Sequence, residues 1–105
     1  MFFGISHLVV PVTNLQRSAA LWCDVMGFAA VQRGDGFVDI DTGSASLRLL
    51  QVQNVEASVA LRLQVGDVAA AYAALLAAGA TSRYAPVKTP QLEEMACVND
   101  ADGHA

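Results

Sequence analysis

The fold is decided by the stretch Ile5–Phe28, which reads ISHLVVPVTNLQRSAALWCDVMGF. Residues 5–12 are rich in β-branched and aliphatic side chains and predict a strand. Asn14 then offers the side-chain oxygen of a helix N-cap, and apolar residues recur at helical spacing as far as Met26. Gly27 is the expected end of that helix, because glycine commonly follows the last helical turn. The stretch therefore predicts a strand, a capped helix and a return into a second strand.

The same pattern returns in residues 58–80, SVALRLQVGDVAAAYAALLAAGA. A shift of 53 positions places Val12 on Val65 and Asn14 on Asp67. The same shift places His7 on Ala60. Because an internal repeat fixes the architecture of a chain, this one predicts two half-domains.

The residues between the repeats change to a period of two, which is typical of strands. We expect strands at 28–33, 36–41 and 44–53, so that the first module has the order β-α-β-β-β. A two-residue turn at Thr42-Gly43 would pair Asp39 with Ser46 and Phe37 with Arg48. This register gathers the apolar positions on one face of the sheet.

The second module is expected to have a strand at 58–65 and a helix from Asp67 to about Ala78. A short strand at 81–84, a loop at 85–94, a strand at 95–99 and a turn at 100–103 follow. Only two residues follow Gly103, where the first module has a whole strand, so we expect the last strand to be missing or supplied from elsewhere. The predicted class is α+β, with one domain over 1–105 made of modules 1–54 and 55–105.

Composition narrows the function classes. The hydrophobic fraction is 54%, only 15% of residues are charged, and the net charge is −4. Scattered basic residues on an acidic chain argue against nucleic acid as a partner. No segment has the length or flanks of a signal peptide or membrane span, so we expect a cytoplasmic protein without membrane contact. The apolar excess and the open strand edge predict a homodimer, and Cys23 and Cys97 are expected to be buried thiols in a reducing compartment.

On four motifs the chain resembles the vicinal oxygen chelate superfamily, which includes glyoxalase I, extradiol dioxygenases and bleomycin resistance proteins. The motifs are ISHLVVPV, the LW…VMGF helix end, LRLQVGDV and NDADGH, in that order over nearly the whole chain. The resemblance implies two βαβββ modules that curl into a mixed-sheet cup around a ligand. In metal-dependent members, the first and last strands of each module each supply one metal ligand.

The resemblance carries over to this chain one position at a time. It places His7 at the first ligand position, Arg48 at the second and Ala60 at the third, and the fourth would fall beyond DGHA. A guanidinium and a methyl group offer no lone pair to a metal. We therefore expect no cofactor, with His7 as a relic ligand position, and glyoxalase, epimerase and dioxygenase activities are all in doubt.

The expected function is metal-free binding of a small organic molecule, as in the antibiotic resistance proteins of the bleomycin branch, in the cup of a homodimer. The ligand-binding residues we expect are His7, Phe37, Asp39, Arg48, Arg62 and Gln64. A long cation such as Arg48 can clamp a carboxylate or a phosphate, and it can equally be neutralised by Asp39. Two alternatives stay open. One is a divergent lyase, isomerase or dioxygenase that uses Zn, Ni, Mn or Fe and whose site is completed by residues outside this chain. The other is a structural or regulatory dimer with a filled cup. No catalytic residue is assigned.

Overall fold

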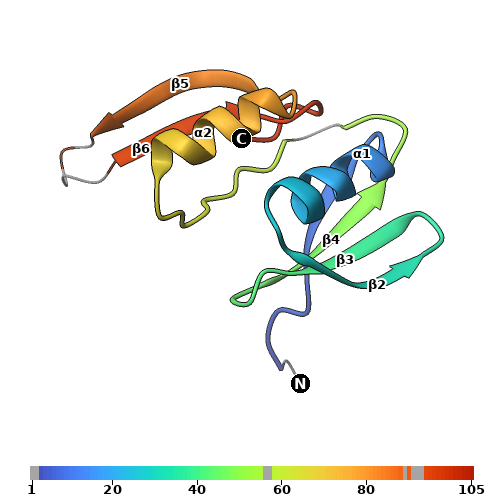
Figure 1. Ribbon diagram of the computed structural model, residues 1–105. Helices are drawn as coiled ribbons and strands as arrows, with labels where there is room; N and C mark the ends of the chain where they lie inside the picture. Colours follow the sequence, from blue (N-terminus) through green and yellow to red (C-terminus); the bar gives the residue numbers. More distant parts are fainter. Residues whose placement is uncertain (1–2, 56–57, 89, 91–93) are drawn as a thin grey trace. The chain divides into compact units, whose positions relative to one another are not determined.

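The computed structural model describes residues 3–55, 58–88, 90 and 94–105. The chain divides into two compact units, Met1–Glu56 and Ala57–Ala105, and each is described by itself (Figure 1). Within the described ranges, no helix is long and apolar enough to cross a membrane.

The first unit is a complete β-α-β-β-β module. Its elements are β1 (Leu8–Val12), α1 (Leu15–Ala20), the π-helical turn η1 (Leu21–Val25), β2 (Ala29–Gly34), β3 (Phe37–Asp41) and β4 (Ser46–Gln51). The four strands form one sheet in the order β1-β4-β3-β2 (Figure 1). β1 runs parallel to β4, and the other neighbours are antiparallel. The chain therefore crosses over through the helix and then returns along two hairpins.

The predicted helix is confirmed, and its last turn is wider than expected. Asn14 caps the helix by accepting the backbone N–H of Arg17 at 3.0 Å. The N–H of Met26 then bonds to the carbonyl of Leu21, five residues earlier, so that η1 is a π-helical turn. Trp22 lies in this turn and is only 7% exposed, as expected for a core residue.

The core of the first unit lies between the helix and one face of the sheet. α1 packs against β3 and β4, and the strands direct alternate side chains toward it. The buried hydrophobic residues are Val10, Val12, Ala19, Trp22, Val38, Ile40, Leu47 and Leu49. The residues between them in β3 and β4, including Asp39 and Arg48, belong to the opposite face.

The predicted register between β3 and β4 is wrong by two residues. Asp39 pairs with Arg48, whereas the two-residue turn would have paired it with Ser46. The reason is a longer loop, in which both the backbone N–H and the hydroxyl of Thr42 bond to the carbonyl of Ala45. A shift of two keeps every side chain on its predicted face. It also brings the guanidinium directly opposite the carboxylate.

The second unit contains α2 (Val68–Ala77), β5 (Thr81–Lys88) and β6 (Glu94–Asn99). Asp67 caps α2 by accepting the N–H of Ala70 at 3.0 Å, as predicted. The strands form an antiparallel pair. β5 is longer than the predicted strand at 81–84, and the predicted loop at 85–94 is wrong for 85–88 and for Glu94, which begins β6. The register shifts between Tyr84 and Val87, which accommodates Pro86, a residue without a backbone donor. The rest of that predicted loop, apart from residues 90 and 94, lies outside the described residues.

The strand predicted at 58–65 is wrong, because these residues have no regular secondary structure. The α+β class is confirmed: the first unit forms a curled, unclosed four-stranded sheet, and the second contributes a separate pair of strands. Two full modules are not present among the described residues. The first strand of the second module is absent there, and so is its last.

Candidate functional site

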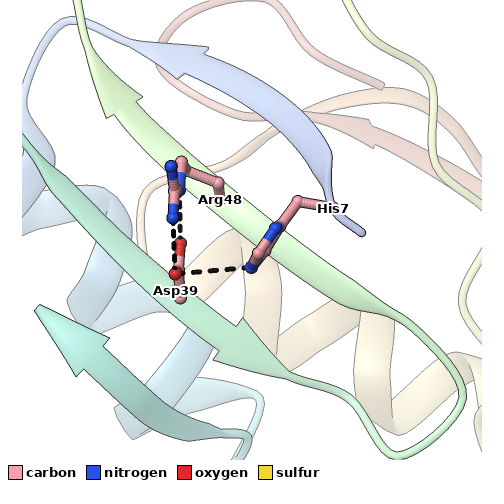
Figure 2. Close-up of polar contacts among 3 residues, drawn as sticks. All are labelled: His7, Asp39 and Arg48. Carbon is pink, nitrogen blue, oxygen red and sulfur yellow. Dashed lines mark hydrogen bonds and ion pairs between the residues drawn. The ribbon is translucent and has the colours of Figure 1, made fainter. Parts of the chain in front are cut away.

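The candidate site is built around the carboxylate of Asp39, in the middle of β3. Asp39 is only 3% exposed, although it belongs to the face of the sheet opposite the core. The guanidinium of Arg48 donates two hydrogen bonds to it, from Nε to Oδ1 at 2.7 Å and from Nη2 to Oδ2 at 2.9 Å. This two-pronged pairing fixes the orientation of both side chains. It forms because the register of β3 and β4 places the two residues opposite each other (Figure 2).

His7 approaches the same carboxylate from the residue just before β1. Its Nε2 lies 3.4 Å from Oδ2 of Asp39, and its side chain is 29% exposed. Figure 2 shows Asp39 between Arg48 and His7. Since Nε2 faces the carboxylate, a neutral imidazole with its proton there keeps the lone pair on Nδ1. Nδ1 has no hydrogen-bond partner within the described part of the chain.

The ring of Phe37 packs against the guanidinium of Arg48. Cζ of Arg48 lies 4.3 Å from the centroid of the Phe37 ring, within the range of a cation–π interaction. The ring in turn lies across Gly34 of β2: a Cβ at this glycine would be 2.1 Å from Cε1 of the ring. A larger residue at position 34 would therefore displace the Phe37 ring. The strand predicted at 28–33 stopped before Gly34, although a glycine near an aromatic residue of the neighbouring strand is a signal that could have indicated this contact.

The ion pair controls the charge state of the site. The hydrogen bonds from Arg48 hold the pKa of the Asp39 carboxyl below its ordinary value, against the opposing effect of burial. The positive charge of Arg48 and the approach of His7 to the carboxylate act in the same direction. The same hydrogen bonds raise the pKa of the Arg48 guanidinium. Asp39 is therefore an anion and Arg48 a cation throughout the physiological range.

These side chains do not fit a divalent metal. Both oxygens of Asp39 are engaged by Arg48, and a guanidinium has no lone pair to offer. Among the described residues, no group of three or more His, Cys, Asp and Glu side chains could hold a metal ion.

Cys23 and Cys97 are free thiols. The expectation that both are buried is wrong, because both are half-buried.

Two of the expected ligand-binding residues, Arg62 and Gln64, belong to the second unit, where both are exposed. Nη2 of Arg62 lies 3.5 Å from the sulfur of Met95. Of the six residues expected to bind the ligand, four lie together: His7, Phe37, Asp39 and Arg48.

A groove of about 320 Å³ lies between α1 and the β2–β3 hairpin. Its walls include Leu15 and Ala19 of the helix and Arg33 of β2. Phe37 also lines this groove, so one ring borders both the groove and the guanidinium of Arg48. Sequence reasoning did not identify the groove, because it depends on how the helix packs over the hairpin.

Solved structures share this fold at low sequence identity. A glyoxalase-related enzyme from Fulvimarina pelagi has a TM-score of 0.79 at 20% identity, over 98% of this chain and 84% of that one. The bleomycin resistance determinant encoded on transposon Tn5 has a TM-score of 0.69 at 20% identity, over 96% and 92%. Lactoylglutathione lyase from Agrobacterium tumefaciens has a TM-score of 0.75 at 17% identity, over 97% and 89%. At these identities the likeness establishes the fold alone.

Sequence comparison identifies the family. Comparison with curated protein sequences gives no match. The family model described as Glyoxalase/Bleomycin resistance protein/Dioxygenase superfamily matches residues 4–105, which is nearly the whole chain. The resemblance inferred from the four motifs is confirmed, and the chain belongs to the glyoxalase/bleomycin resistance protein/dioxygenase superfamily.

Proposed function

We propose that the protein binds a small organic molecule without a metal, in the manner of the bleomycin-resistance branch of its superfamily. The observation that supports this proposal is the pairing of Arg48 with Asp39. The guanidinium of Arg48 donates hydrogen bonds to both oxygens of the Asp39 carboxylate, which leaves that carboxylate unsuited to coordinating a metal. The same arrangement leaves groups that suit the recognition of an organic ligand.

Three groups are available to such a ligand. The Nη1 amino group of Arg48 has no partner among the described residues, and the side chain is 35% exposed. Because the guanidinium already covers Phe37, a flat ligand stacks on the outer face of the guanidinium, and the ring acts as its support. Nδ1 of His7 accepts a hydrogen bond from the ligand. The ligand is therefore a flat molecule with an acceptor for Arg48 and a donor for His7.

The relatives support this reading only in part. The shared fold includes both a bleomycin resistance determinant and a lactoylglutathione lyase, so the fold does not choose between binding and catalysis. The chemistry of the side chains favours binding. A homodimer, a cytoplasmic location and a role in antibiotic resistance belong to the same proposal.

The first test is metal content, by plasma mass spectrometry of the purified protein and calorimetric titration with Zn²⁺, Ni²⁺, Mn²⁺ and Fe²⁺. We expect neither stoichiometric metal nor micromolar binding. Stoichiometric metal whose binding is lost in His7→Ala would favour the alternative, a metal-dependent lyase, isomerase or dioxygenase.

The second test is a thermal-shift screen with bleomycin-type glycopeptides and flat aromatic carboxylates, followed by calorimetry of the hits. We expect Arg48→Met to weaken binding at least tenfold. The matched control is Arg17→Met, an exposed arginine on α1, which we expect to stay within twofold of the unaltered protein. Equal affinities of the two variants would refute the assignment of Arg48 to the ligand.

A further inference from the structure

The groove between α1 and the β2–β3 hairpin has a cation on its apolar side of the sheet. Arg33 pairs with Val38 across the hairpin, and residues paired in this way direct their side chains to the same face of a sheet. Val38 is 3% exposed and belongs to the core face. Arg33 therefore lies on the face that α1 covers, at the edge strand β2, and it lines the groove.

The walls around this cation are apolar. Leu15 and Ala19 of α1 lie on one side of the groove, and Phe37 and Val38 of β3 lie on the other. The volume of about 320 Å³ is within the range of sites that hold small organic molecules, roughly 300–1,000 Å³. This part of the groove therefore suits a hydrocarbon group.

The groove continues along the helix past Arg33. A second depression of about 230 Å³ shares Gln16, Ala19 and Arg33 with the first and extends to Cys23 and Asp24 in η1. η1 is a π-helical turn, a geometry that recurs at functional sites. Arg33 thus lies where an apolar depression meets a more polar one.

The charge of Arg33 is not neutralised within the described part of the chain. Its guanidinium is exposed and forms no ion pair or hydrogen bond with a described side chain, Asp24 included. Arg48 differs, because Asp39 accepts two hydrogen bonds from it. An unpaired guanidinium presents parallel N–H groups that match the two oxygens of a carboxylate. Charge complementarity therefore favours an anionic group at Arg33.

We propose that this groove binds an amphipathic carboxylate, with its hydrocarbon chain between α1 and the hairpin and its carboxylate on the guanidinium of Arg33. A free medium-chain fatty acid is the simplest member of this class. The groove belongs to the helix-covered face of the sheet, whereas Asp39 and Arg48 belong to the opposite face. This proposal therefore does not depend on the proposed small-molecule function.

The probe is sodium octanoate, titrated by calorimetry and followed through backbone amide shifts in NMR spectra. We expect saturable binding, with the largest shifts at residues 15–24 and 33–38. Arg33→Gln removes the cation and should weaken binding about tenfold, as for the loss of a hydrogen bond to a charged group. The matched control is Arg17→Gln, an exposed arginine of α1 that lines neither depression, which should stay within about twofold of the unaltered protein.

Two further measurements separate the chain from the charge. Octanol has the hydrocarbon chain without the carboxylate, so its affinity should be the same for the unaltered protein and for Arg33→Gln. Gln16→Trp, at an exposed position that lines both depressions, should block octanoate by filling the groove.

Three results would overturn the proposal: no saturable binding of octanoate, equal affinities of Arg33→Gln and Arg17→Gln, or shifts centred on His7 and Arg48. Self-association of Arg33→Gln with unchanged affinity for octanoate would also overturn it, because the cation would then only protect the edge of β2 from pairing.

Discussion

Replacing Leu49 by alanine tests whether the core lies on the face of the sheet described above. Leu49 is 0% exposed in the middle of β4, whereas its neighbour Leu50 points to the opposite face and is 38% exposed. The same substitution at both positions removes the same atoms from the same strand. Only the burial of those atoms differs.

The magnitude follows from the atoms removed. Leucine to alanine deletes three carbons, and at about 0.8 kcal/mol for each buried carbon the transfer loss is roughly 2.4 kcal/mol. At Leu49 a closed cavity adds to this loss, so that we expect a cost of about 3–5 kcal/mol in the free energy of unfolding. At Leu50 the partial exposure limits the loss to about 1.5 kcal/mol, with no closed cavity.

The assay is urea unfolding followed by the fluorescence of Trp22, the single tryptophan, which is buried in the first unit. With a denaturant dependence of about 1–2 kcal/mol per molar urea, Leu49→Ala should lower the midpoint by roughly 1.5 M or more, or leave the unit unfolded in water. Leu50→Ala should lower it by no more than about half as much. Equal shifts, or a larger shift for Leu50→Ala, would refute the assignment of the core face.

Three further predictions concern the site. Gly34→Ala should push the Phe37 ring away from Arg48, because the new Cβ would clash with the ring. The NMR signal of Arg48 Nε–H should then lose its ring-current shift. The same signal should not move in Gly66→Ala, where the new Cβ has no atom within 4 Å. Asp39→Asn should destabilise the protein at pH 7 and make little difference near pH 2. The reason is that the pKa of the Asp39 carboxyl is lower in the folded protein than in the unfolded chain. The ionised carboxylate therefore stabilises the folded state at pH values above the unfolded-state pKa, and this stability is lost as the pH falls through the folded-state pKa. A destabilisation that is the same at pH 2 and pH 7 would contradict this. Arg48→Glu should lower the melting temperature, because the introduced glutamate and Asp39 would repel each other. Zn²⁺ should restore it, because two carboxylates and His7 can bind the metal. A rise in melting temperature with Zn²⁺ in the unaltered protein would contradict the conclusion that its side chains do not fit a divalent metal.

Local features were predictable from sequence because they depend on neighbours in the chain. The caps at Asn14 and Asp67 use a side-chain oxygen and an N–H three residues later, a geometry that the residue type nearly dictates. The faces of β3 and β4 depend only on alternation, so they survived an error of two in the register. The repeat and the four motifs indicated the element order of the first module and the superfamily before any geometry was available.

The candidate site could be predicted in membership but not in arrangement. His7, Phe37, Asp39 and Arg48 follow from their places on the strands, yet their contacts depend on the loop at Thr42, whose hydroxyl bonds set its length. For that reason Arg48, which was expected opposite Phe37, lies opposite Asp39.

The sequence by itself determined the caps, the alternating faces, the repeat and the family, since each is written in residue types at fixed spacing. Only the tertiary structure decided which residues of facing strands meet, that Gly34 makes room for a ring, and that residues 58–65 lack regular structure. The physical reason is the same in each case. A strand's pairing is fixed by hydrogen bonds to a partner distant in sequence, and within the described part of the chain the backbone of residues 58–65 bonds to the backbone of Ala105 and to the side chain of His104.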